Sequence, residues 1–124
     1  MPRPPKPKTK MNIRPKDLRR FPRIKFQNSL HYQVRGSPDS SSTISDNISI
    51  NGICFINDRY LPALTSIMLD INLLSRVLRP IGRVVWSEPF SHSDRFKAGV
   101  EFFEFDQQEK KFLSEFITMK LDQT

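Results

Sequence analysis

The chain has 124 residues, of which 37% are hydrophobic, with ten phenylalanines and one cysteine. This length supports a single domain with one modest core. Since Cys54 is alone, an internal disulfide and a multi-cysteine metal site are excluded.

The N-terminal segment is proline-rich and basic. Residues 1–17 contain five of the ten prolines and little to bury, so we expect a flexible, disordered tail ahead of a domain at 18–121. Residues 1–25 hold ten Lys and Arg against one Asp, whereas the remaining residues hold ten cations and twelve anions. This asymmetry predicts an anionic partner, although a basic tail can also serve only solubility.

No apolar stretch follows the basic N-terminus, and no run approaches the roughly 20 apolar residues of a membrane span. We therefore expect neither a secretory signal nor a membrane span, and a cytoplasmic protein.

The middle of the chain has the pattern of strands. Apolar and polar residues alternate over 29–35, the period of a half-buried strand, and the Ser- and Gly-rich stretch 36–42 predicts a turn. A second extended piece covers 43–56. We expect a bulge or tight bend in it at Asn51-Gly52, because glycine tolerates a positive φ.

Three further runs have the same period, with a hairpin loop containing His92 between the last two. The residues expected to share a face are Ile67, Leu69, Ile71 and Leu73 in the first run, Val84 and Trp86 in the second, and Phe96, Ala98, Val100 and Phe102 in the third. Repeated strands without intervening helices indicate an antiparallel barrel or sandwich.

The C-terminal segment is helical in pattern. Asp106 and Glu109 have the spacing of a capping box, in which each side chain binds a backbone N–H of the first turn. The apolar residues that then fall on one helical face are Phe112, Leu113, Phe116 and Ile117. We expect this helix to close an edge or an end of the barrel.

Catalytic and cofactor motifs are missing. His31 and His92 lack metal-ligand spacing and are expected at the surface, and Cys54 is expected to be a small core residue. Four glycines build neither a Rossmann nor a Walker phosphate loop. The sequence predicts no enzyme, no cofactor and no metal.

Two polar motifs remain. Arg19, Arg20 and Arg23 carry guanidinium groups, which bind phosphates and the O6/N7 edge of guanine and stack on flat rings. In the extended stretch 47–52, Asn47 and Ser49 share a face and offer an amide and a hydroxyl. We expect Gly52 to leave room there for a ring to approach the backbone.

Arg-x-x-x-Arg at 19–23 followed by Asn-x-Ser-x-x-Gly at 47–52 resembles the paired motif of PilZ domains, bacterial receptors for cyclic di-GMP. The later stretches "GRVVW" and "AGVEFF" and the closing helix are similar to the same family, so the resemblance covers about residues 18–120. It implies a six-stranded antiparallel β-barrel with a C-terminal helix. It also implies a cyclic di-GMP site formed by Arg19, Arg23, Asn47, Ser49 and Gly52, with Arg20 and Trp86 as further contacts. For Trp86, core packing with Val84 is an alternative of at least equal weight.

These features predict a cyclic di-GMP receptor whose N-terminal segment becomes ordered on binding and which signals through an unidentified effector protein. Motility, pili, exopolysaccharide and biofilm are the family-level processes. The alternative from another class is a small basic-tailed barrel that binds nucleic acid; the acidic body and the lack of a stacking platform disfavour it. A third possibility is an adaptor that binds only protein.

Overall fold

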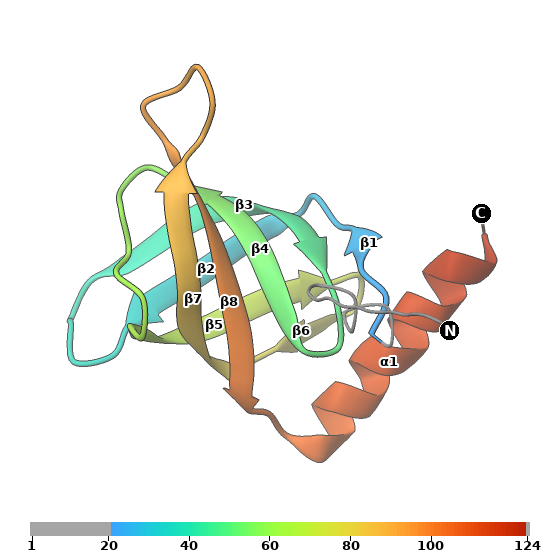
Figure 1. The fold of residues 1–124 in the computed structure, drawn as a ribbon. Coiled ribbons are helices and arrows are strands. Elements are labelled where there is room, and N and C mark those ends of the chain that lie inside the picture. Colours follow the sequence, from blue (N-terminus) through green and yellow to red (C-terminus); the bar gives the residue numbers. More distant parts are fainter. Residues whose placement is uncertain (1–20, 124) are drawn as a thin grey trace, which may run out of the picture.

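The structure is a computed structural model, and it describes residues 21–123. Its elements in chain order are β1 (Ile24–Lys25), β2 (Ser29–Val34), β3 (Ser40–Ile48), β4 (Gly52–Asn57), β5 (Ser66–Leu73), β6 (Arg76–Leu78), β7 (Ile81–Pro89), β8 (Phe96–Glu104) and α1 (Gln107–Asp122) (Figure 1).

Six strands form a closed antiparallel barrel. They are hydrogen-bonded in the order β3-β2-β5-β7-β8-β4, and β4 pairs back with β3, so this sheet has no free long edge. Of the two short strands, β1 pairs with β3 and β6 pairs with β5. The predicted six-stranded barrel with a C-terminal helix is confirmed.

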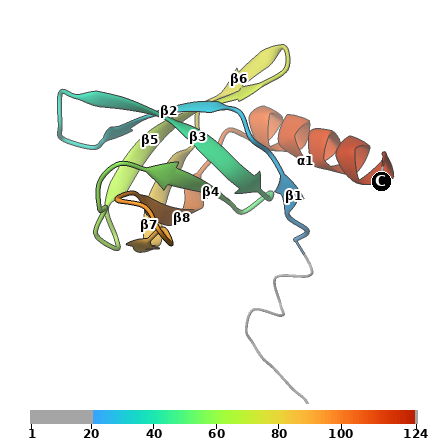
Figure 2. The ribbon, with the colours of Figure 1, turned by 90° about the horizontal axis from the view of Figure 1, so that it is seen from above.

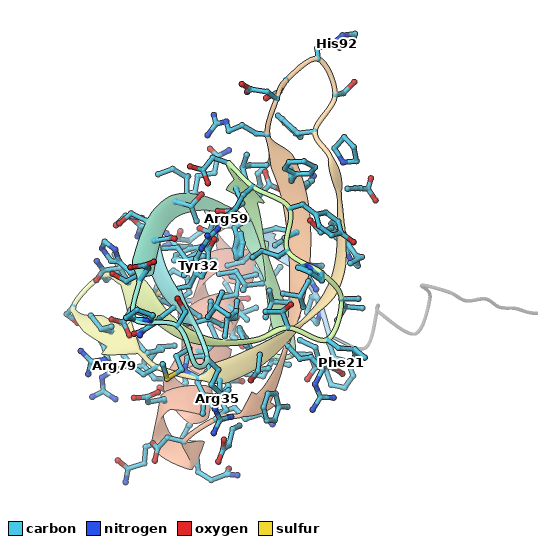
Figure 3. The ribbon with its side chains drawn as sticks, turned by 90° about the vertical axis from the view of Figure 1, so that its left-hand side faces the viewer. Phe21, Tyr32, Arg35, Arg59, Arg79 and His92 are labelled. Carbon is cyan, nitrogen blue, oxygen red and sulfur yellow. The ribbon has the colours of Figure 1, made fainter. Side chains whose placement is uncertain are left out.

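The core lies inside the ring of strands. All four apolar residues predicted to share a face in β5 are buried. The ring of Tyr32 stacks on Phe55 with 5.3 Å between centroids, and its hydroxyl donates a hydrogen bond of 2.9 Å to Oδ1 of Asn57. Figure 3 shows Tyr32 within the barrel, and His92 at the tip of the loop that leads from β7 to β8.

Helix α1 lies beside β1 at one end of the barrel (Figures 1 and 2). Its buried residues are Leu113, Phe116 and Ile117, and the rings of Phe116 and Phe26 form a T-shaped pair with 5.8 Å between their centroids. The Asp106 carboxylate caps the helix by accepting from the N–H groups of Gln108 and Glu109.

The second half of the predicted capping box is wrong. The Glu109 carboxylate accepts from the backbone N–H of Arg79 at 2.8 Å and thereby ties α1 to the segment between β6 and β7. The sequence pattern fixes only the spacing of a capping box, and here a neighbouring loop offers the competing donor.

Three features of the strands also differ from expectation, the first being the short strand β1, which was not predicted. Strand β3 already begins at Ser40, within the stretch predicted as a turn. Strand β6 was not predicted, because the turn before it contains Leu74 at a φ of 36° in place of glycine or asparagine.

The expected shared face of Val84 and Trp86 is wrong as well. Val84 is fully buried, whereas Trp86 is 40% exposed. The register against β8 shifts between these two residues, so Val84 pairs with Val100 and Trp86 pairs with Gly99. This β-bulge at Val85 turns Trp86 to the outer face of the barrel and excludes its packing beside Val84.

Within residues 21–123, the helix is not long and apolar enough to cross a membrane.

Candidate functional site

Arg23 reaches from the segment before β1 to the end of β3. The short strand β1 pairs Lys25 with Asn47. This pairing holds Arg23, the residue just before β1, next to the β3–β4 turn. Nε of Arg23 donates to Oδ1 of Asn47 at 2.6 Å, and its Nη1 donates to Oγ of Ser49 at 3.3 Å. The structure therefore brings Arg23 together with two predicted residues that lie 24 and 26 positions later in the sequence.

Burial changes the electrostatics of this contact. It lowers the pKa of the Arg23 guanidinium, and the nearby Cys54 opposes that shift. Arg23 nevertheless keeps an exposed surface, so its guanidinium remains open to a ligand from solvent.

Ser49 is buried and organises the turn between β3 and β4. Its N–H donates to the carbonyl of Gly52 at 2.9 Å, and its Oγ accepts from the N–H of Asn51 at 3.1 Å. The same Oγ accepts from Arg23, so one hydroxyl couples the turn to the arginine.

Gly52 is the first residue of β4, and the positive φ expected for it is wrong. The one glycine with a positive φ in residues 21–123 is Gly36, in a different turn. A Cβ at Gly52 would instead collide with the backbone carbonyl oxygen of Val100 in β8. The close approach of two strands therefore requires glycine here, and contact of Gly52 with a ligand stays a prediction.

A bulge in β3 places Asn47 on the outer face. Ser45 and Ile48 are both buried although they lie three positions apart, and the register against β4 shifts between Ser45 and Asn47. Asp46 is the extra residue of this bulge. Its carboxylate accepts from Nδ2 of Asn47 at 2.7 Å and lies 3.7 Å from Nζ of Lys97.

The strand pairings extend this outer face into a row of residues, which we call the outer row: Lys25, Asn47, Cys54, Gly99 and Trp86. Each member pairs with the next across β1, β3, β4, β8 and β7. A Cβ at Gly99 would lie 2.8 Å from Cζ2 of Trp86, so the indole ring lies directly over this glycine. Arg23 with Asn47 thus stands toward one end of the row, and an exposed aromatic ring stands at the other.

Cys54 lies in the middle of the outer row. It is buried, as predicted, but it faces this row and is not part of the core cluster inside the barrel. Burial raises the pKa of its thiol, aided by Asp46 and opposed by Lys97, Arg23 and Asn47. Sequence reasoning missed Asp46, Cys54, Lys97 and Gly99 as residues of this face, since two bulges set which side chains point outward.

Comparison with known proteins assigns the chain to a family. The family model of the PilZ domain matches residues 17–119. The chain belongs to the PilZ domain family.

Solved structures share this PilZ fold. The inhibitor of motility MotI/DgrA of Bacillus subtilis aligns with a TM-score of 0.72 at 19% identity, over 90% of this chain and 53% of that protein. YcgR of Escherichia coli, in complex with c-di-GMP, aligns with a TM-score of 0.61 at 9% identity, over 84% of this chain and 46% of that one. MrkH of K. pneumonia, also in complex with c-di-GMP, aligns with a TM-score of 0.60 at 9% identity, over 84% of this chain and 52% of that one. The PilZ chain thus spans about half the length of these proteins. The comparison with curated proteins found no match.

Arg19 and Arg20 precede the described part of this PilZ domain. Their predicted contacts with guanine and phosphate therefore lie outside the described residues.

Proposed function

We propose that this PilZ domain is a receptor for cyclic di-GMP, which it binds on the outer face of the barrel between Arg23 and Trp86. The observation that carries the proposal is the meeting of Arg23 with Asn47 and Ser49. In this arrangement a cation, an amide and a hydroxyl converge beside a strand surface that ends in an exposed indole.

The chemistry of the ligand fits these groups. Arg23 supplies a planar donor for a phosphate or for the O6/N7 edge of guanine. The exposed ring of Trp86 supplies a flat apolar surface on which a purine stacks. The family membership and the c-di-GMP complexes of YcgR and MrkH support the same ligand.

Arg19, Arg20 and Gly52 complete the proposed site. The two arginines add guanidinium groups from the same N-terminal segment as Arg23. Gly52 keeps the β3–β4 turn close to β8, which holds Ser49 in place. We further propose an effector protein as the partner and the cytoplasm as the location. Ordering of the N-terminal segment on binding stays a prediction, which amide exchange of residues 10–26 with and without nucleotide tests.

Calorimetric titration with cyclic di-GMP tests the proposal, with GMP as the control ligand. Arg23→Ala should abolish measurable binding, because it removes the charge and the link between Asn47 and Ser49. Arg35→Ala is the matched control, since Arg35 is an exposed arginine that follows β2 at the turn to β3. Figure 3 shows its position on the barrel. Equal affinity of Arg23→Ala and the unchanged protein would refute the site.

The same titrations address the alternative of nucleic-acid binding through the basic N-terminal segment. Affinity for a nucleic acid depends on many phosphate contacts, so it falls steeply with salt and tolerates the loss of one arginine. Binding of single-stranded DNA or RNA that survives Arg23→Ala, with no binding of cyclic di-GMP, would favour that alternative.

A further inference from the structure

The Asp46–Asn47 hydrogen bond joins side chains that are neighbours in sequence. In a regular strand such neighbours point to opposite faces and do not meet. Here the bulge turns both side chains outward, and the Asp46 carboxylate accepts from Nδ2 of Asn47 at 2.7 Å. The Nζ of Lys97, 3.7 Å away, offsets the charge of this carboxylate.

The two partners of Asn47 fix the orientation of its amide. A guanidinium has only N–H donors, so the amide atom of Asn47 that faces Arg23 is the oxygen. A carboxylate only accepts, so the atom that faces Asp46 is the amide nitrogen. A base held by Arg23 therefore meets an acceptor on Asn47, and the amide cannot turn over without losing both bonds.

We propose that Asp46 is a specificity-determining residue, which locks Asn47 as an acceptor beside Arg23 and thereby selects guanine over adenine. The inference rests on the proposed cyclic di-GMP site and concerns which base that site takes. Asp46 acts through Asn47 and is a positioning residue.

The hydrogen-bonding edges of the two purines carry the argument. Guanine presents the O6 acceptor next to the N1–H donor, which matches a guanidinium donor next to an amide acceptor. Adenine presents the reverse order, an N6 amino donor next to the N1 acceptor. Its donor would therefore face the guanidinium donor, and its acceptor would face the amide oxygen. If Asp46 does not hold the amide, Nδ2 can turn toward the base and donate to N1 of adenine, and part of the discrimination is lost.

The test is the ratio of the dissociation constants for cyclic di-AMP and cyclic di-GMP, measured by calorimetry. Asp46→Ala also removes a negative charge beside an anionic ligand, which strengthens the binding of both nucleotides alike. The ratio is therefore the informative quantity. We expect it to fall about tenfold, the discrimination that one well-placed pair of hydrogen bonds provides.

The double variant Asp46→Ala/Asn47→Asp separates positioning from general structural damage. A carboxylate at position 47 offers only acceptors in either orientation, so it should restore the ratio without Asp46. Lys97→Met is the matched control. It leaves the Asp46–Asn47 hydrogen bond in place. It should weaken the binding of both nucleotides while the ratio of their dissociation constants stays the same.

An unchanged ratio in a folded Asp46→Ala protein, judged by its melting curve, would overturn the inference and leave the proposed function intact. Failure of the double variant to restore a lowered ratio would also overturn it. If the unchanged protein binds neither nucleotide, the proposed function fails and this inference fails with it.

Discussion

Gly99→Ala tests the packing at the aromatic end of the outer row. An added Cβ would lie 2.8 Å from Cζ2 of Trp86 and closer still to its Cε2 and Nε1, well inside van der Waals contact. The backbone of β8 cannot yield easily, because Gly99 pairs with Cys54 on one side and with Trp86 on the other. The indole must therefore leave its place over the glycine.

The size of the effect follows from the exposure of the ring. Overpacking typically costs about 1–3 kcal/mol. Because Trp86 is 40% exposed and can swing toward solvent, we expect the lower half of that range. In a domain of this size, each kcal/mol lowers the melting temperature by roughly 4 °C. If the ring stacks on a purine, the affinity for cyclic di-GMP falls as well.

Tryptophan fluorescence gives a local measurement, since Trp86 is the one tryptophan of the chain. Its emission should shift to longer wavelength as the ring moves into water. Gly36→Ala is the control: a Cβ there meets no atom within 4 Å, but the φ of 87° strains it by about 1–2 kcal/mol. The control should lose similar stability without an emission shift. A Gly99→Ala protein with unchanged emission and melting temperature would refute the position of the ring over Gly99.

Three further changes test other parts of the structure. Gly52→Ala places a Cβ against the backbone carbonyl of Val100, which cannot move aside like a side chain. Denaturant unfolding should show a free energy of unfolding lowered by about 3 kcal/mol, and a decrease below about 1 kcal/mol would contradict the close approach of the two strands. Tyr32→Phe removes the donor to buried Oδ1 of Asn57 and should lower the free energy of unfolding by about 1–3 kcal/mol, whereas a neutral result would mean that the oxygen finds another donor. For Cys54, burial raises the pKa of the thiol, so the reactive thiolate forms only at higher pH. When the alkylation rate is measured against pH, the midpoint pH should be higher in the folded protein than in the denatured protein. Equal midpoints would contradict the burial.

The sequence predicts the parts of the fold that follow a regular period. Alternation in β2 and β5 identifies their buried faces, and the apolar spacing of α1 identifies the side that packs on the barrel. The order of the motifs also identifies the family, which the match over residues 17–119 confirms.

The irregular positions are those that the sequence does not predict. A bulge adds one residue and reverses the face of the next, which a regular alternation of apolar and polar residues does not predict. For this reason Trp86 was expected beside Val84, and Asp46 was not recognised beside Asn47. Gly52 was assigned to a positive φ for a similar reason, because its collision partner in β8 is distant in sequence.

The two bulges have one consequence for the proposed site. Without the bulge in β3, Asn47 would point into the barrel like Ser45, and without the bulge in β7, Trp86 would point inward like Val84. The first change would remove Asn47 from the outer row, and the second would remove Trp86. The closed barrel therefore sets the distance between the polar group and the aromatic ring without a ligand, which would reduce the ordering cost of binding in the proposed site. In the proposed site, a ligand would compete with Ser49 for Nη1 of Arg23, while Nε keeps its bond to Asn47. Such an exchange would replace one hydrogen bond by another, so the gain in free energy would come from the charge of the ligand and from stacking rather than from the number of hydrogen bonds.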